Sequence, residues 1–165
     1  LALTRGGDYV GVLNLMGRVF IDTIDCPFKK ADEEIEKLRK KAKIIFVDMH
    51  AEVTSEKTAM GHYLDGRVSA VVGSHTHVQT ADECILPKGT AYLTDAGMTG
   101  PVDSVIGITK EIAISRFLTR LPKRMETSNN PGQVRGALVS IDSRSGRATA
   151  IQRIQIPPAS LSTRG

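Results

Sequence analysis

Three of the four histidines follow apolar runs that have the length of buried β-strands. His50 follows the run 44–47, and His75 and His77 follow the run 68–72. The carboxyl ends of neighbouring parallel strands meet at one edge of an α/β sheet, where such folds build their sites. Neutral imidazole is the commonest nitrogen ligand for zinc, manganese and iron. The three positions therefore indicate a candidate metal site.

The spacing of His75 and His77 has a direct geometric meaning. In extended backbone, residues i and i+2 project to the same side, so two imidazoles could reach one ion or one each of two adjacent ions. Gly73 and Ser74 allow a tight backbone path beside such a site. From spacing alone, a metal site and ordinary structural histidines are about equally favoured.

The remaining titratable residues give weaker signals. His62 lies inside an expected helix, and we expect it not to be a ligand. None of the nearby carboxylates has an obvious ligand spacing: Asp82 is typical of a turn, and Glu52 could support a ligand histidine but is more simply a surface or capping residue. The carboxylates considered are Asp48, Glu52, Asp65, Asp82 and Asp95. No G-x-S-x-G, Walker A or dinucleotide motif is present, which argues against those enzyme classes.

The elements that must position these residues follow the order of an α/β fold. Strands, helices and hairpins in this order predict a mixed sheet or two packed sheets. Thr54 and Ser55 are the expected N-caps of the helix that precedes Gly66. The pattern predicts strands over 9–15, 44–47, 68–72, 136–141 and 147–156, a hairpin of 84–87 with 90–94, and helices over 30–43, 54–65 and 108–118.

Composition limits the classes of function. The chain has 165 residues, 41% of them hydrophobic and 24% charged, which suits a single domain over 1–156 followed by a loose tail, 157–165. The net charge of +4 is mild and aromatic residues make up only 4%, so a nucleic-acid partner is disfavoured. Cys26 and Cys84 lie far apart, which fits a reducing cytoplasm. No apolar run approaches the roughly 20 residues of a membrane span.

Longer blocks of sequence carry a family resemblance. Residues 46–57, 65–82 and 93–101, together with Asn14–Arg18, resemble the YmdB family of bacterial calcineurin-like metallophosphoesterases. The resemblance extends over nearly the whole chain. It implies the carboxy-terminal portion of a four-layer α/β/β/α metallophosphoesterase sandwich with mixed sheets. The first residue is leucine and an apolar strand follows soon after, which agrees with that expectation.

The resemblance also implies a ligand set. In that superfamily two divalent metal ions lie between two sheets; by resemblance His50 and His75 bind one ion and His77 binds the other. The family suggests manganese or iron, and the ligand types are also compatible with zinc. The early aspartate, the bridging carboxylate, the asparagine ligand and the histidine that acts as general acid do not occur here. We expect them in an amino-terminal part of about 90–100 residues that this sequence lacks.

The implied activity is hydrolysis of a small-molecule phosphodiester, such as a cyclic nucleotide, at a two-metal centre. An alternative is a catalytically inactive scaffold or regulatory interaction domain that retains the fold. The upstream reading frame distinguishes the two. The missing ligand motifs would support the enzyme, whereas an unrelated segment or a start codon would support the scaffold.

Overall fold

The strand that carries His50 runs through the middle of a six-stranded sheet in the computed structural model, which describes residues 1–158. The strand order is β1-β2-β3-β4-β6-β5, with β2, β3, β4 and β6 parallel and both edge strands antiparallel. Parallel pairing brings the carboxyl ends of β2, β3 and β4 to one edge. The strands are β1 (Ala2–Leu3), β2 (Tyr9–Met16), β3 (Ile44–His50), β4 (Ala70–Ser74), β5 (Cys84–Ile85) and β6 (Ala91–Leu93).

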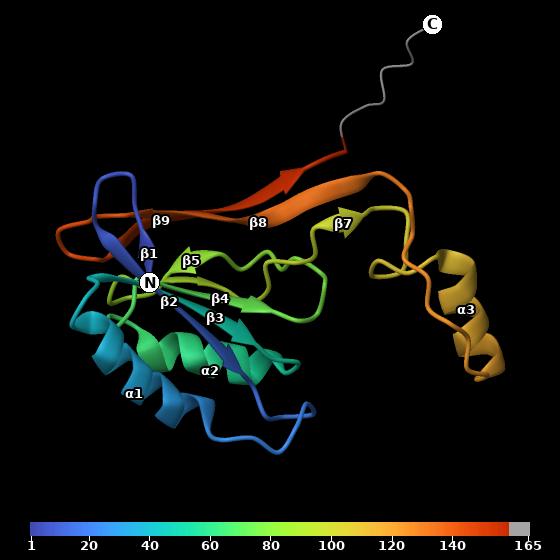
Figure 1. Cartoon of the computed structure of the whole chain (residues 1–165), viewed down its shortest axis with the longest axis horizontal. Helices are drawn as coiled ribbons and strands as arrows, with labels where there is room; N and C mark the ends of the chain where they lie inside the picture. Colours follow the sequence, from blue (N-terminus) through green and yellow to red (C-terminus); the bar gives the residue numbers. More distant parts are fainter. Residues whose placement is uncertain (159–165) are drawn as a thin grey trace, which may run out of the picture.

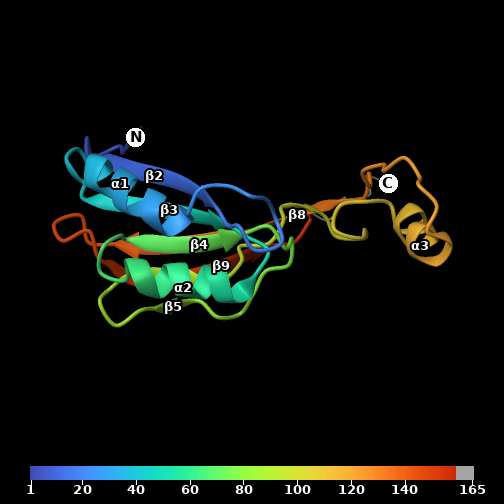
Figure 2. The same cartoon turned by 90° about the horizontal axis from the view of Figure 1, so that it is seen from below.

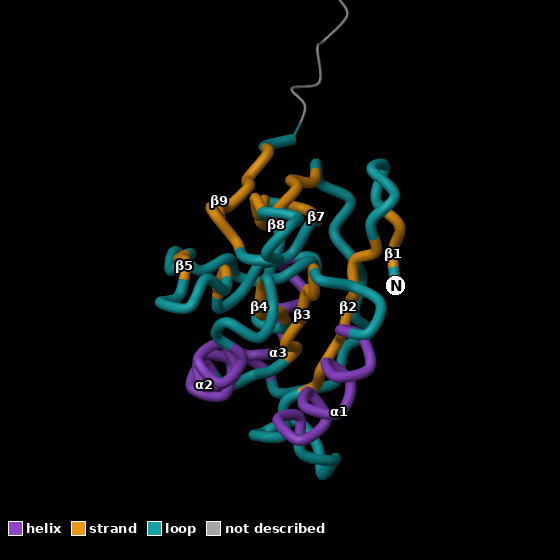
Figure 3. Tube along the Cα trace, turned by 90° about the vertical axis from the view of Figure 1, so that its left-hand side faces the viewer, coloured by secondary structure: helices purple, strands orange, loops and turns teal. Residues whose placement is uncertain are grey.

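Two helices, α1 (Pro27–Arg39) and α2 (Thr54–Leu64), cover one face of this sheet (Figures 1 and 3). Burial alternates along β3 because successive side chains point to opposite faces. The buried set belongs to the main aliphatic core, which includes Ile35 of α1, Ile45, Val47 and Met49 of β3, and Met60 and Leu64 of α2.

A second, antiparallel sheet covers the opposite face (Figure 1). It consists of β7 (Gly100–Pro101), β8 (Gly132–Ile141) and β9 (Ala148–Ile156). Small side chains at the contact form a second core of Ala70, Ala91 and Ala148, against which Phe46, Val139 and Ile151 pack. Phe46 is therefore on the β3 face that meets this second sheet. Asp48 and His50 share that face because of the two-residue period.

The third helix, α3 (Lys110–Thr119), stands away from these layers at the end of a projecting arm (Figure 2). A pocket of about 460 Å³ opens on it, with walls that are mainly apolar. Its lining includes Ile106, Ile108, Phe117, Leu121 and Met125, with Arg116 and Arg120. Among residues 1–158, no helix has the length and apolar character needed to cross a membrane.

The predicted elements agree with the structure except at several boundaries. The expected helix 30–43 begins earlier, at Pro27, because proline at the first helical position has no N–H to lose. It ends at Arg39, and 41–43 lead directly into β3. The expectation of a Thr54 or Ser55 N-cap is wrong: Val53 precedes the helix, and no side chain caps it. The end near Gly66 is confirmed, with that glycine at φ +78°.

The described residues form three layers, helices on a mixed sheet on an antiparallel sheet, which confirms an α/β fold with mixed pairing. The hairpin of β5 with β6 and the final pair β8–β9 are antiparallel as expected. The short strands β1 and β7 were not expected, because two-residue segments carry no periodicity. Most of the predicted tail 157–165 lies outside the described residues.

Candidate metal centre

A chain of hydrogen bonds crosses the carboxyl ends of β2, β3 and β4. The strand register places Asn14 beside Asp48 and His50 beside Ser74. The Asn14 amide Nδ2 donates to Asp48 Oδ2 at 2.7 Å, and the Ser74 hydroxyl donates to Asp48 Oδ1 at 2.7 Å. Residues from three strands are thus connected through one carboxylate.

These hydrogen bonds determine which ring nitrogen of His50 carries the hydrogen and which carries the lone pair. Ser74 Oγ lies 3.0 Å from His50 Nδ1. Since the Ser74 hydrogen is already donated to Asp48, Ser74 Oγ must accept from an Nδ1–H of His50. His50 is therefore held as the tautomer whose Nε2 carries a lone pair, and this Nε2 points away from the strand toward His75.

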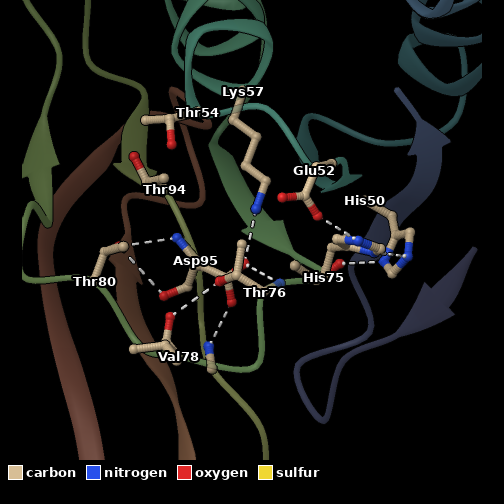
Figure 4. Close-up of polar contacts among 12 residues, drawn as sticks. His50, Glu52, Thr54, Lys57, His75, Thr76, Val78, Thr80, Thr94 and Asp95 are labelled. Carbon is tan, nitrogen blue, oxygen red and sulfur yellow. Dashed lines mark hydrogen bonds and ion pairs between the residues drawn. The ribbon is translucent and has the colours of Figure 1, made fainter. Parts of the chain in front are cut away.

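His75 lies in the turn after β4 and meets His50 edge to face, with ring centroids 4.8 Å apart (Figure 4). Its Nδ1 lies 3.0 Å from His50 Nε2, and its Nε2 lies 2.8 Å from Glu52 Oε2. A carboxylate accepts hydrogen bonds, so Glu52 takes the Nε2–H of His75. A neutral His75 ring then carries a lone pair on Nδ1 that faces the lone pair of His50, whereas a protonated ring donates Nδ1–H to it.

Two lone pairs that face each other at 3.0 Å repel unless a cation lies between them. Either a proton or a metal ion meets this requirement. Metal–nitrogen bonds of about 2.0–2.1 Å at tetrahedral or octahedral angles would separate the two nitrogens by about 2.9–3.4 Å. The spacing and the donor types of His50 and His75 therefore fit a shared metal ion.

His77 is not brought into contact with the other two histidines. Its ring is exposed, and Nδ1 lies 3.3 Å from the carbonyl oxygen of Ile106, at the base of the α3 arm. The carbonyl accepts from Nδ1–H, which leaves the lone pair on Nε2. In its neutral form, His77 thus carries its lone pair on Nε2, outside the His50–His75 pair.

The described residues do not complete a metal site. Within 1–158, no three histidine, cysteine, aspartate or glutamate side chains are placed so that they could hold an ion together. His50 and His75 supply two nitrogens, while the carboxylates beside them, Asp48 and Glu52, hydrogen-bond to Ser74 and to His75.

A buried ion pair between Lys57 and Asp95 lies next to the turn that follows β4 (Figure 4). Lys57 Nζ is 2.7 Å from Asp95 Oδ2, and both side chains are 1% exposed. Burial raises the pKa of Asp95, but hydrogen bonds from Lys57 and from the N–H groups of Thr76 and Gly97 outweigh burial and hold this pKa below its ordinary value. Asp95 is therefore an anion at neutral pH.

Some site residues were not identified from the sequence. Asp48 and Ser74 were not recognised as the partners that orient His50, although Asp48 precedes His50 by two positions and so shares its face of β3. Glu52 was expected mainly as a surface residue, and it contacts His75 rather than His50. His62 is exposed on α2, away from this chain of contacts. No spacing rule links Lys57 to Asp95, since only the tertiary fold brings them together.

Comparison with known proteins identifies relatives of this chain. The chain is 52% identical over 150 residues to a Bacillus subtilis protein named 2',3'-cyclic-nucleotide 2'-phosphodiesterase, a match that covers 91% of this chain and 57% of that protein. It is 37% identical over 152 residues to a Mycoplasma genitalium protein named as a phosphatase/phosphodiesterase, covering 89% of this chain and 53% of the relative. The chain thus spans little more than half the length of these relatives.

Two solved structures share the fold. A hypothetical protein from Thermus thermophilus superimposes with a TM-score of 0.88 at 41% identity, covering 95% of this chain and 61% of that one. A phosphatase from Mycoplasma pneumoniae superimposes with a TM-score of 0.81 at 37% identity, covering 89% and 53%. The sequence matches the YmdB-like protein family over residues 2–154. The chain therefore belongs to the YmdB-like protein family.

Proposed function

We propose that the full-length protein containing this chain is a phosphodiesterase that uses two divalent metal ions, with His50, His75 and His77 among their ligands. The observation that carries the proposal is the 3.0 Å approach of two ring nitrogens, His50 Nε2 and His75 Nδ1. Such a pair needs a cation, and the shared position suits a metal ion. The phosphodiesterase names of the relatives support the same reaction class.

Each histidine has a distinct task in this proposal. His50 and His75 would bind one ion through Nε2 and Nδ1, and His77 would bind a second ion through Nε2. Asp48 and Ser74 hold His50 in the required tautomer, and Glu52 does the same for His75. When bound, the two metal ions would lower the pKa of a water molecule and balance charge on the phosphate.

The remaining parts of the active centre would come from outside the described residues. We propose that this chain is the carboxy-terminal part of a four-layer sandwich whose other part supplies the bridging carboxylate, further ligands and the general acid. Manganese or iron suits the mixed nitrogen and oxygen ligands, and zinc is also compatible. The name of the Bacillus subtilis relative makes 2',3'-cyclic nucleotides the first substrates to test.

Metal content of the full-length protein tests the ligand assignment. We expect His75→Ala to lose much of the bound metal, measured by elemental analysis after purification from manganese-supplemented cells. His62→Ala is the matched control, since His62 is an exposed histidine on α2 and has no side-chain contact with the site. Equal metal loss in both variants would contradict the assignment.

Turnover of a 2',3'-cyclic nucleotide by the same preparations tests the reaction. The wild-type protein is expected to hydrolyse it only when metal is present, and His75→Ala is expected to lose that turnover. Full metal occupancy without turnover of any phosphodiester would instead favour the inactive scaffold or regulatory domain.

A further inference from the structure

The Lys57–Asp95 ion pair lies next to Thr76, in the turn that follows β4 (Figure 4). A buried ion pair generally contributes less to stability than apolar side chains of the same volume would, because both charges lose their hydration. An ion pair in this position therefore suggests a role beyond stability. The other contacts of Asp95 indicate what that role is.

The carboxylate of Asp95 uses both oxygens to hold backbone. Oδ2 accepts from the N–H of Thr76 at 3.0 Å, and Oδ1 accepts from the N–H of Gly97 at 2.9 Å. Thr76 separates His75 from His77. One carboxylate oxygen thus binds Lys57 and, at the same time, the backbone between the two candidate ligands.

The backbone on both sides of Thr76 is strained. His75 has a φ of +118° and His77 a φ of +64°, and residues other than glycine rarely adopt such positive values. Such conformations persist only where surrounding contacts fix them, and they concentrate at functional sites. The bond from Thr76 N–H to Asp95 lies at the midpoint of this strained pair.

The ends of the turn are held by the segment that follows Asp95. The N–H of Ala96 donates to Gly73 O at 2.9 Å, and the N–H of Met98 donates to His77 O at 3.1 Å. Lys57 lies close beneath: a Cβ added at Gly73 would come within 2.8 Å of Lys57 Cδ. The turn therefore rests on Lys57 and is tied along its length to the segment 95–98.

We propose that Lys57 and Asp95 are positioning residues that hold the 73–77 turn in its strained form and so present the imidazoles of His75 and His77 to the metal ions. The inference rests on the proposed function for the identity of the ligand, but the restraint on the turn is a property of the polypeptide alone. Lys57 fixes the carboxylate, and the carboxylate fixes the turn.

The double variant Lys57→Met, Asp95→Asn separates positioning from stability. The Met and Asn side chains are uncharged and similar in shape to those they replace, so the stability of the fold should be largely retained. Asparagine has only one side-chain oxygen, so either Thr76 or Gly97 would face an amide donor instead of an acceptor. A pair with a purely structural role would leave the turn and metal binding unchanged in this variant.

The experiment uses the full-length protein without metal and then with manganese. Amide hydrogen exchange followed by mass spectrometry should show faster exchange over 75–78 in the double variant, with β3 and β4 unchanged. Titration with manganese should show affinity about 10–100-fold weaker, the usual effect of disturbing residues that orient ligands. Wild-type exchange and wild-type affinity in the folded double variant would overturn the proposal.

Two further arms keep the result interpretable. Asp32→Asn removes the carboxylate of another ion pair, with Arg67, outside the histidine site, and should leave manganese affinity unchanged.

Thr80→Val is a milder second variant, because Thr80 Oγ1 accepts from the N–H of Asp95 at 2.9 Å. Loss of protection from amide exchange over 75–78 in this variant supports positioning, whereas wild-type protection argues against it. A wild-type protein that binds none of manganese, iron and zinc would refute the proposed function, while the exchange data on the turn would still test the restraint.

Discussion

His50 Nε2 and His75 Nδ1 lie 3.0 Å apart although 25 positions separate the two residues. The approach follows from parallel pairing of β3 with β4, which places His50 beside Ser74 and brings the next residue within reach. His50 Nδ1–H then donates to Ser74 Oγ and His75 Nε2–H donates to Glu52, which leaves room for one cation, a proton or a metal ion, between the two facing nitrogens. A site that attracts a cation is thus produced by strand register and two hydrogen bonds.

Removing the hydroxyl of Ser74 should weaken metal binding without removing a ligand. In Ser74→Ala, His50 Nδ1 loses its acceptor and Asp48 loses a donor, so neither the orientation nor the tautomer of His50 is fixed. We expect metal affinity of the full-length protein to fall about 10–100-fold, measured by titration calorimetry. Ser140→Ala, at an exposed serine of β8, is the control and should bind as wild type. Unchanged affinity in Ser74→Ala would show that His50 is oriented by other contacts.

A methyl group at Gly73 should destabilise the fold at the site itself. The added Cβ would lie 1.8 Å from the carbonyl oxygen of Thr94, a backbone atom that cannot move aside easily. We expect Gly73→Ala to lower the free energy of unfolding by about 1–3 kcal/mol or more, as overpacking does, measured by urea titration. At Gly136 an added Cβ meets no atom within 4 Å, so Gly136→Ala is expected to be near neutral. Similar losses of stability in both variants would contradict the close approach of β4 to the backbone of Thr94.

Some of this arrangement could be predicted from the sequence, and some could not. The apolar runs before His50 and His75 predicted strand ends, and the strand ends form one edge of the sheet as expected. The contact of Lys57 with Asp95 depends on how α2 sits over β4 and on the path after β6, and neither follows from a local pattern. The φ values of His75 and His77 are likewise imposed by tertiary contacts, because the residue types alone disfavour them.

The free energy of unfolding should depend on pH through the ionisation of Asp95. The pKa of this carboxyl is lowered in the folded protein from its ordinary value of 3.8, so its ionised form stabilises the fold above about that pH. This contribution is lost as the pH falls through the lowered pKa. Urea titrations from pH 7 to pH 3 should therefore show Asp95→Asn less stable than wild type at pH 7, with the difference narrowing below 3.8. A difference independent of pH would mean that Asp95 is not ionised in the folded protein.

The 165-residue chain by itself is expected to show no phosphodiesterase activity, because its described residues supply an incomplete ligand set. By the proposed assignment, one ion would receive only His50 and His75 from this chain and the other only His77. General acid–base help alone is typically worth about 10²–10⁴ in rate, and the residue expected to provide it is not among those described. Purified chain should therefore show no manganese-dependent turnover of bis-p-nitrophenyl phosphate, whereas the full-length protein should. Robust turnover by the isolated chain would show that the active centre lies elsewhere in these residues, or that a second copy completes it.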